Sequence, residues 1–124
     1  MKLGLGPYPA ATPEGNEGAH YRRVCAHAAL AEEEGFDSVW LEPGRQLSGA
    51  SPFPLGAAVA RRTRALRIVV RPRLGLTHPV YAAEDTATLD LIAAGRAVLA
   101  PSAWPDADSL GAYGIPAGEA GERF

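Results

Sequence analysis

The stretch GFDSVWLEPGR, residues 35–45, decides the fold class because it joins the end of a helix to a strand. An acidic triplet at residues 32–34 ends a helical pattern, and Gly35 follows where a helix C-terminus favours left-handed backbone. The apolar run at residues 39–41 has no polar alternation, which is typical of a strand buried on both faces. The stretch therefore predicts a buried strand that places Glu42 at its C-terminal tip.

Strands and helices alternate along the rest of the chain. The predicted strands cover residues 2–7, 36–41, 66–70 and 97–100, and the predicted helices cover residues 20–34, 52–64 and 80–94. Residues 101–118 are expected to be loop, and residues 119–124 to begin another helix. Helical connections between short apolar strands predict parallel, right-handed pairing. A doubly wound sheet and part of a (β/α)8 barrel both satisfy this order, although no G-x-G-x-x-G dinucleotide turn follows the first strand.

Composition narrows the classes of protein that fit. The 124 residues suit one domain, residues 1–124, and the net charge of -2 argues against a nucleic-acid partner. Cys25 is the single cysteine, which excludes an intrachain disulfide, and we expect it to be a small buried residue. No apolar run approaches the roughly 20 residues that span a bilayer, so we expect no membrane contact and a cytoplasmic location.

Two motifs carry a family resemblance. The run AEEEGFDSVW at residues 31–40 leads the first helix into the second strand, and HPVYAAEDTATLDLIAAGR at residues 78–96 leads the third helix into the fourth strand. The similarity extends over residues 20–41, 51–68, 77–96 and 110–124. In these segments the chain resembles the bacterial luciferase-like flavin monooxygenase family.

The resemblance implies a fold, a cofactor and a reaction class. Members fold as (β/α)8 barrels and use reduced flavin mononucleotide (FMN), or a deazaflavin, with oxygen to oxidise small organic substrates such as aldehydes, alkanes or sulfonates. A full barrel takes about 250 residues, so this chain is expected to be the N-terminal half of such a barrel, with four parallel strands and three helices. The cofactor is then expected at the C-terminal ends of the strands.

Three side chains are candidate cofactor-binding residues because they stand at or just after the ends of three successive strands. They are Glu42, Arg71 and Ser102. No catalytic residue is assigned. No metal site is expected, because the helical pair His20 and His27 lacks a carboxylate as third ligand.

Two interpretations of the function remain open from the sequence. The first is an active luciferase-like oxidoreductase with a small-molecule substrate. The second is a catalytically inactive half-barrel that forms a homo-oligomer or complements a partner chain, with or without flavin, because four strands leave two open sheet edges. Many family members carry histidine after the acid that ends the second strand, whereas PGR follows Glu42 here, and this weakens the enzymatic interpretation. A truncated gene product would show the same features.

A basic cluster surrounds the third predicted strand. Its members are Arg61, Arg62, Arg64, Arg67, Arg71 and Arg73. The simpler interpretation is a solvated helix end followed by turn residues. The alternative is an anion site, for a flavin phosphate or an acidic partner, and only Arg71 and Arg73 follow the strand on the expected ligand side.

The remaining charged residues of the second motif have structural interpretations. His78 precedes Pro79 at a predicted helix start, so we expect it to shape that turn. Glu84 and Asp90 lie on a helix expected outside the barrel, and charge pairing, for example with Arg96, is favoured over catalysis.

Overall fold

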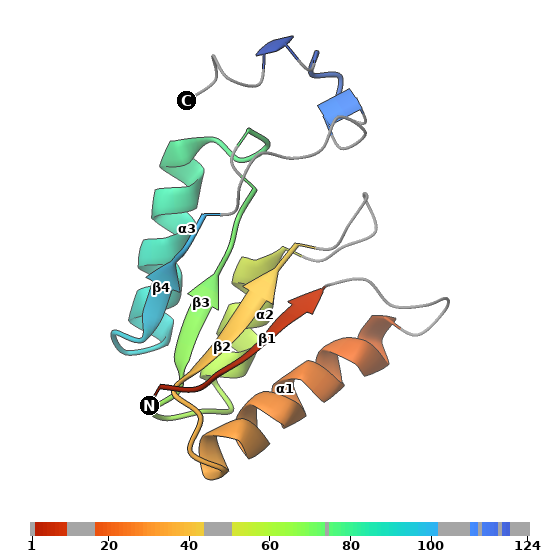
Figure 1. The fold of residues 1–124 in the computed structure, drawn as a ribbon. Coiled ribbons are helices and arrows are strands. Elements are labelled where there is room, and N and C mark those ends of the chain that lie inside the picture. Colours follow the sequence, from red (N-terminus) through yellow and green to blue (C-terminus); the bar gives the residue numbers. More distant parts are fainter. Residues whose placement is uncertain are drawn as a thin grey trace.

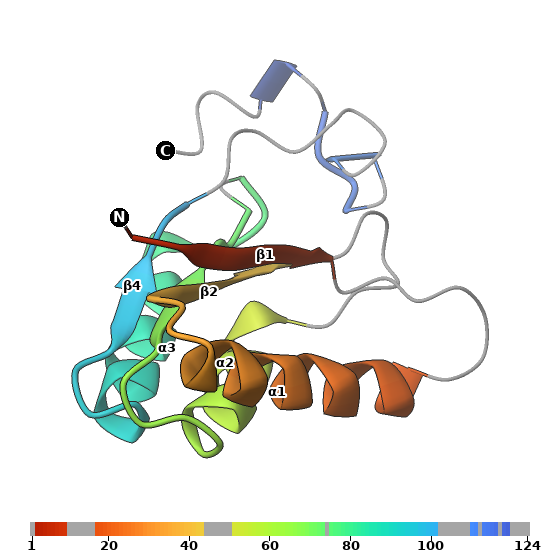
Figure 2. The ribbon, with the colours of Figure 1, turned by 60° about the horizontal axis from the view of Figure 1, so that its bottom comes forward.

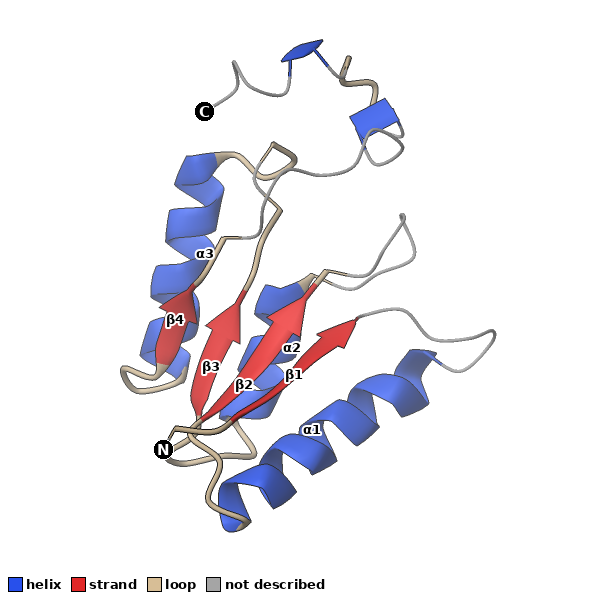
Figure 3. Cartoon of the chain, in the orientation of Figure 1, coloured by secondary structure: helices blue, strands red, loops and turns tan. Residues whose placement is uncertain are grey.

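The described part of the chain alternates strands and helices. A computed structural model describes residues 2–9, 17–43, 51–73, 75–101, 110–111, 113–116 and 118–119. Its elements in chain order are β1 (Gly4–Pro9), α1 (Glu17–Glu33), β2 (Ser38–Glu42), α2 (Pro52–Ala60), β3 (Arg67–Val70), α3 (Pro79–Ile92) and β4 (Ala97–Leu99). Figure 1 and Figure 3 show a helix between each pair of successive strands. The sequence predicts all of these elements, with bounds that differ by a few residues.

The sheet topology selects one of the two architectures that fit the sequence. All four strands pair in parallel, in the order β1-β2-β3-β4. The three helices lie on one face of the sheet, as Figure 2 shows. A doubly wound sheet carries helices on both faces, whereas a (β/α)8 barrel carries them only outside. The fold is therefore a barrel-type half, with its inner face opposite the helices.

The core lies between the sheet and the helices. Alternate residues of β2 and β3 are fully buried there: Val39, Leu41, Ile68 and Val70. Burying one such side chain contributes about 1.5–3 kcal/mol, so this layer is the main source of stability. A Cβ at Gly56 of α2 would lie 3.0 Å from Leu89 Cδ2, so glycine at this position lets α2 approach α3 and β3 closely.

Helix α1 ends as the sequence predicts. Gly35 has a φ of +84°, and its N–H donates to the carbonyl of Glu32. The N–H of Phe36 donates to the carbonyl of Ala31 at 2.9 Å, which completes a Schellman motif. Glycine is suited to this position because it has no Cβ to clash in the left-handed region.

Helix α3 has the same type of ending with a different residue in the left-handed position. The sequence predicts that Gly95 closes this helix, but the residue in the first left-handed position is Ala94, with a φ of +53°. Gly95 follows at +81°, and its N–H donates to the carbonyl of Asp90 at 3.0 Å. An alanine in this conformation costs roughly 1 kcal/mol relative to glycine, so α3 ends with local strain.

Helix α2 is shorter than the sequence predicts, because a distant arginine binds its last carbonyls. The prediction extends the helix to Arg64, but it ends at Ala60. The Arg96 guanidinium donates to the carbonyls of Ala60 and Thr63 at 3.1 Å each and to that of Leu66 at 2.8 Å. Its Nε also donates to the carbonyl of Ala93 at 2.7 Å, so Arg96 joins the ends of α2 and α3.

Glu32 fixes the loop between α2 and β3 to the end of α1. Its carboxylate accepts the backbone N–H groups of Arg64, Ala65 and Leu66 at 2.6–3.0 Å. Burial by itself would raise the pKa of this carboxyl, but the three N–H groups, with the nearby Arg96, lower the pKa below its ordinary value. The acid that would oppose the α1 dipole is thus held by donors from another segment.

The inner face of the sheet differs from the expectation of strands buried on both faces. Val69 of β3 is 4% exposed, but Trp40 of β2 is 36% exposed and Val98 of β4 is 37% exposed. A hollow of about 330 Å³ lies on this face and is lined by residues that include Trp40, Val69, Val98 and Arg67. In the described part of the chain, helices cover only the opposite face.

The segment after β4 is not purely loop. Residues 110–111 are helical, and Leu110 and Ile115 are buried in a small cluster with Leu76, which precedes α3. In Figure 1 this segment lies beyond the C-terminal ends of the strands. Residues 118–119 form a short 3-10 turn, and residues 120–124 lie outside the described part.

Two expectations from composition can be compared with the structure. Cys25 is 8% exposed in the core, as predicted, and burial raises the pKa of its thiol, with a partial opposite effect of Arg62. Within the described residues, none of the helices combines the length and the apolar character needed to cross a bilayer.

Candidate functional site

Two of the three predicted site residues meet at the C-terminal end of the sheet. Glu42 is the last residue of β2, and Arg71 directly follows β3. Because Leu41 pairs with Val70, the two tips lie side by side, and Arg71 Nη1 forms an ion pair with Glu42 Oε1. The Arg71 side chain is 31% exposed and the Glu42 side chain 28% exposed, so the pair is shielded but reachable. The sequence predicts both residues but not their pairing.

A tryptophan extends this pair onto the inner face. The Arg71 guanidinium carbon lies 5.8 Å from the centre of the Trp40 ring, within the range of a cation–π contact. Trp40 Nε1 donates to Ser38 Oγ at 3.1 Å, which fixes the ring along the strand. A Cβ at Gly4 would lie 2.9 Å from Trp40 Nε1, so the indole lies against the backbone of β1. The sequence predicts Trp40 only as part of a buried strand, and its contact with the Arg71 guanidinium was not predicted.

Arg71 retains hydrogen-bonding capacity. Its Nε is buried and has no hydrogen-bond partner in the part of the chain that the structure describes. Buried donors are nearly always paired, so an unpaired one at the tip of a barrel strand marks a place for another acceptor.

The third predicted residue, Ser102, lies outside the described residues, as do Gly44 and Arg45 of the opening stretch. The strand that leads to Ser102 is in place, since the N–H of Ala100 donates to the carbonyl of Val70 at 3.0 Å. The role of Ser102 therefore stays a prediction.

The basic cluster divides between the two ends of the sheet. Arg61, Arg62 and Arg64 are exposed between α2 and β3, at the end of the sheet opposite Glu42 and Arg71. They fit the interpretation of a solvated helix end. Arg67 is exposed at the start of β3, at the same end as these three. The remaining two, Arg71 and Arg73, follow β3 on the C-terminal side, as the sequence predicts.

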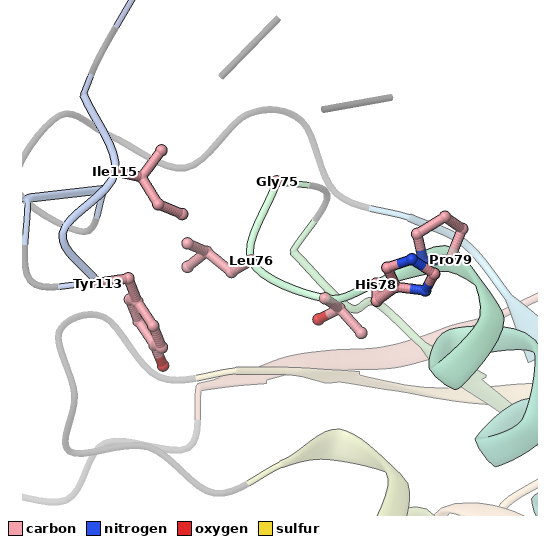
Figure 4. Close-up of a pocket in the computed structure, with 7 residues that line it drawn as sticks. Gly75, Leu76, His78, Pro79, Tyr113 and Ile115 are labelled. Atoms are coloured by element: carbon pink, nitrogen blue, oxygen red, sulfur yellow. The ribbon is translucent and has the colours of Figure 1, made fainter. Parts of the chain in front are cut away.

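A cleft adjoins the strand tips and was not predicted. It has a volume of about 440 Å³ and lies between the start of α3 and the segment after β4. Figure 4 draws its described lining residues as sticks: Gly75, Leu76, Thr77, His78, Pro79, Tyr113 and Ile115. In Figure 4, Tyr113 and Ile115 lie beside Leu76 and come from the opposite segment. The sequence feature that could have indicated a folded segment here is the apolar pair Leu110 and Ile115, in a stretch that otherwise resembles a loop.

A second hollow connects this cleft toward the ion pair. It has a volume of about 250 Å³ and shares Leu76, Thr77 and Tyr113 with the cleft. Its lining also includes Pro43 and Pro72, which follow Glu42 and Arg71 in the chain. The two hollows therefore share part of their lining, and the second one reaches residues next to the ion pair.

His78 shapes the turn at the start of α3, as the sequence predicts, and it also lines the cleft. It is the N-cap of α3, and its Nδ1 accepts the N–H of Val80 at 3.2 Å. Its ring also lies edge-on to Tyr81, with 5.9 Å between ring centres. In the neutral ring, an Nδ1 that accepts leaves Nε2 as the nitrogen that carries hydrogen.

Of the two acids of the second motif, Asp90 makes a structural contact, though a different one from the predicted charge pair. Asp90 Oδ1 accepts the backbone N–H of Ala97 at 3.0 Å and so links α3 to β4. Arg96, its predicted partner, donates to carbonyls and to Thr63 Oγ1. Glu84 is exposed on α3.

The chain is similar to a known family and to curated proteins. A family model described as luciferase-like monooxygenase matches residues 1–124. An F420-dependent glucose-6-phosphate dehydrogenase of Beutenbergia cavernae is 40% identical over 87 residues, which cover 63% of this chain and 26% of that protein. The enzyme of the same name from Amycolatopsis mediterranei is 32% identical over 112 residues, or 83% of this chain and 33% of that protein. The chain thus spans about a third or less of the length of these curated relatives.

Solved structures agree with the half-barrel architecture. The monooxygenase RslO1 from Streptomyces bottropensis matches with a TM-score of 0.88 and 32% identity, over 100% of this chain and 40% of that one. The oxygenating constituent of 3,6-diketocamphane monooxygenase from Pseudomonas putida, solved in complex with FMN, has a TM-score of 0.83 over 94% of this chain and 33% of that one. At 23% identity the second match shows the fold alone. With the family match over its full length, the chain belongs to the luciferase-like monooxygenase family.

Proposed function

We propose that this chain provides the N-terminal half-barrel of a flavin- or deazaflavin-dependent oxidoreductase, in which Arg71 contacts the bound cofactor. The observation that carries the proposal is the Arg71 side chain, which lies at a strand tip beside an aromatic ring and whose Nε has no hydrogen-bond partner among the described residues. In barrels of this type ligands bind at the C-terminal ends of the strands. The family match and relatives named for F420 or bound to FMN support the cofactor class.

The residues present fit such a cofactor. Reduced FMN and F420 carry a planar ring system edged with carbonyl and ring-nitrogen acceptors, and a guanidinium is suited to donate to them. The indole of Trp40 gives an apolar surface beside that donor. When bound, the cofactor supplies the electrons or hydride of the reaction.

In this proposal Glu42 orients the Arg71 side chain, and Arg71 balances the negative charge of the reduced cofactor. Glu42 accepts from Arg71 Nη1 and so fixes the guanidinium plane relative to the inner face. Arg71 would present positive charge to the reduced, electron-rich ring of a bound cofactor, which would stabilise that form. Glu42 is engaged in the ion pair, so its role is to position Arg71 rather than to accept a substrate proton. Ser102 remains a proposed third contact, after β4.

Cofactor titration tests the proposal. In the purified protein, fluorescence quenching of FMN and of F420 is measured anaerobically, in oxidised and reduced forms. Arg71→Met is expected to weaken binding of the reduced cofactor 10- to 100-fold, about the effect of losing one charged hydrogen bond. Arg61→Met, at an exposed position at the opposite end of the sheet, is the matched control and is expected to change binding less than twofold. Equal effects of both variants, or no binding of either cofactor, would contradict the proposal.

We also propose that partner strands cover the inner face, from a second copy of the chain or from a complementary chain. In the described sheet β1 pairs only with β2 and β4 only with β3, and Trp40 and Val98 are over a third exposed beside the inner hollow. Light scattering tests this, since Val98→Asp is expected to reduce the oligomeric mass to that of one chain. A wild-type mass equal to one chain would refute self-association. Association without cofactor binding would instead favour a catalytically inactive half-barrel.

A further inference from the structure

We infer that Trp40 is a positioning residue for the cofactor site, and that Gly4 of β1 sets the place of its indole from the neighbouring strand. The inference rests on the proposed function, because it gives Trp40 the task of holding Arg71 in the orientation that binds the cofactor. Its basis is a line of close approaches across the inner face, from β1 through the indole to the tip of β3.

The strand register brings Trp40 within reach of Arg71. Trp40 of β2 pairs with Val69 of β3, and Arg71 lies two residues further along the chain. Side chains two residues apart on a strand point to the same face, so Arg71 lies diagonally across from the indole. The Arg71 guanidinium carbon is 5.8 Å from the centre of the ring. Arg71 is therefore held at two places, by the Glu42 carboxylate and by the indole.

This double hold prepares Arg71 for a ligand. An arginine side chain has many rotamers, and ordering it when a ligand binds lowers the affinity. The contact with the indole restricts these rotamers before binding, while the buried Nε has no hydrogen-bond partner among the described residues. Loss of the indole is therefore expected to weaken cofactor binding through Arg71, without any contact between the indole and the cofactor.

The place of the indole depends in turn on Gly4. Gly4 pairs with Ser38, and a Cβ at Gly4 would lie 2.9 Å from Trp40 Nε1 and 3.0 Å from Ser38 Oγ. These are the two atoms of the 3.1 Å hydrogen bond that fixes the indole. Gly4 and Trp40 both line the inner hollow of about 330 Å³, which leaves room for a displaced ring. Gly4→Ala is therefore expected to move the indole rather than the strands.

Hydrogen exchange at the Arg71 side chain tests the hold in the protein without cofactor. The Arg71 Nε–H signal is assigned by its loss in Arg71→Met, and its exchange with water is followed by NMR. We expect exchange about two- to fivefold faster in Trp40→Leu and in Gly4→Ala, the effect of losing one cation–π contact, and a nearly unchanged rate in Trp40→Phe, which keeps a ring. Leu99→Ala, at an apolar position of β4 with a similar exposed fraction, is the control and is expected to leave the rate unchanged. Unchanged exchange in Trp40→Leu would overturn the inference.

A double-mutant cycle tests the same hold through cofactor affinity. The protein is titrated anaerobically with reduced FMN or reduced F420, whichever it binds. Trp40→Leu is expected to weaken binding about two- to fivefold in the wild-type background and to have no further effect beside Arg71→Met. An equal loss in both backgrounds would mean that Trp40 acts independently of Arg71, and would overturn its positioning role. No effect of Arg71→Met itself would refute the proposed function, whereas the exchange experiment decides separately whether Trp40 holds Arg71.

A compensating pair distinguishes displacement of the indole from general damage to β1. Phenylalanine lacks Nε1, the atom that a Cβ at Gly4 would approach most closely, so Gly4→Ala is expected to do less harm beside Trp40→Phe. The double variant should recover the cofactor affinity and the Arg71 exchange rate of Trp40→Phe alone. If Gly4→Ala weakens binding equally in both backgrounds, its effect does not pass through the indole, and the role of Gly4 is refuted.

Discussion

The two ends of the four-stranded sheet are held together in different ways. At the N-terminal end, Glu32 accepts from three backbone N–H groups and Arg96 donates to four carbonyls and a hydroxyl. At the C-terminal end, Glu42 and Arg71 pair with each other, and Arg71 Nε remains unpaired in the described part of the chain. One end uses its charged side chains to close the fold, and the other retains capacity for a ligand. This division follows the general rule for barrels, in which one face stabilises and the other reacts.

The largest effect on stability is expected from Arg96→Met. The substitution leaves the carbonyls of Ala60, Leu66 and Ala93 without their charged donor, and we expect a loss of about 3–4 kcal/mol of unfolding free energy. Urea denaturation measures it. Arg61→Met, at an exposed position on the same end of the sheet, is the control and is expected to change stability by less than about 0.5 kcal/mol. A similar small effect of both would show that the N-terminal end is not held by Arg96.

The next largest effect is expected from Glu32→Gln, at about 1.5–3 kcal/mol. The pKa of Glu32 is lowered in the folded state. Its contribution is therefore fully present above pH of about 4.3, the ordinary glutamate value, and is lost as pH falls through the lower folded-state pKa. The difference in stability between wild type and Glu32→Gln should shrink on acidification. Glu33→Gln, at the exposed neighbouring position, is the control and is expected to change stability by less than about 0.5 kcal/mol. A difference for Glu32→Gln that stays constant with pH would contradict this assignment.

A smaller change, in the stabilising direction, is expected from Ala94→Gly. The φ of +53° at Ala94 is strained for a residue with a Cβ, and glycine relieves that strain. We expect a gain of about 0.5–1 kcal/mol, measured as a higher urea midpoint. The reverse change at the end of α1, Gly35→Ala, should destabilise by a similar amount. Destabilisation by Ala94→Gly would mean that side-chain contacts of Ala94 outweigh its backbone strain.

The smallest effect on stability is expected from Arg71→Met, which nevertheless should have the largest effect on cofactor affinity. A partly exposed ion pair contributes about 0–1 kcal/mol, so unfolding should change little while binding weakens. Thermal unfolding and cofactor titration on the same preparation separate the two effects. A loss of stability as large as that of Arg96→Met would show that both ends of the sheet are structural.

A feature of the site can be predicted from the sequence when the residues that interact are close together in the chain. The left-handed Gly35 and the N-cap His78 are visible in the sequence because each acts within a few residues of its own helix end. The early end of α2 is not visible, because it depends on Arg96, more than thirty positions later. The ion pair of Glu42 and Arg71 required the register of β2 against β3, although each residue was predicted at its own strand tip.

The sequence alone determined the order of strands and helices, their parallel pairing and the family, because hydrophobic period, helix-end residues and two linear motifs are local properties. The tertiary structure decided between a doubly wound sheet and a half-barrel, since only the path of the chain puts all three helices on one face. It also decided that Arg71 lies between Glu42 and Trp40, and that a cleft forms where Tyr113 and Ile115 approach Leu76. These features arise from contacts between segments far apart in the chain, which no local pattern specifies.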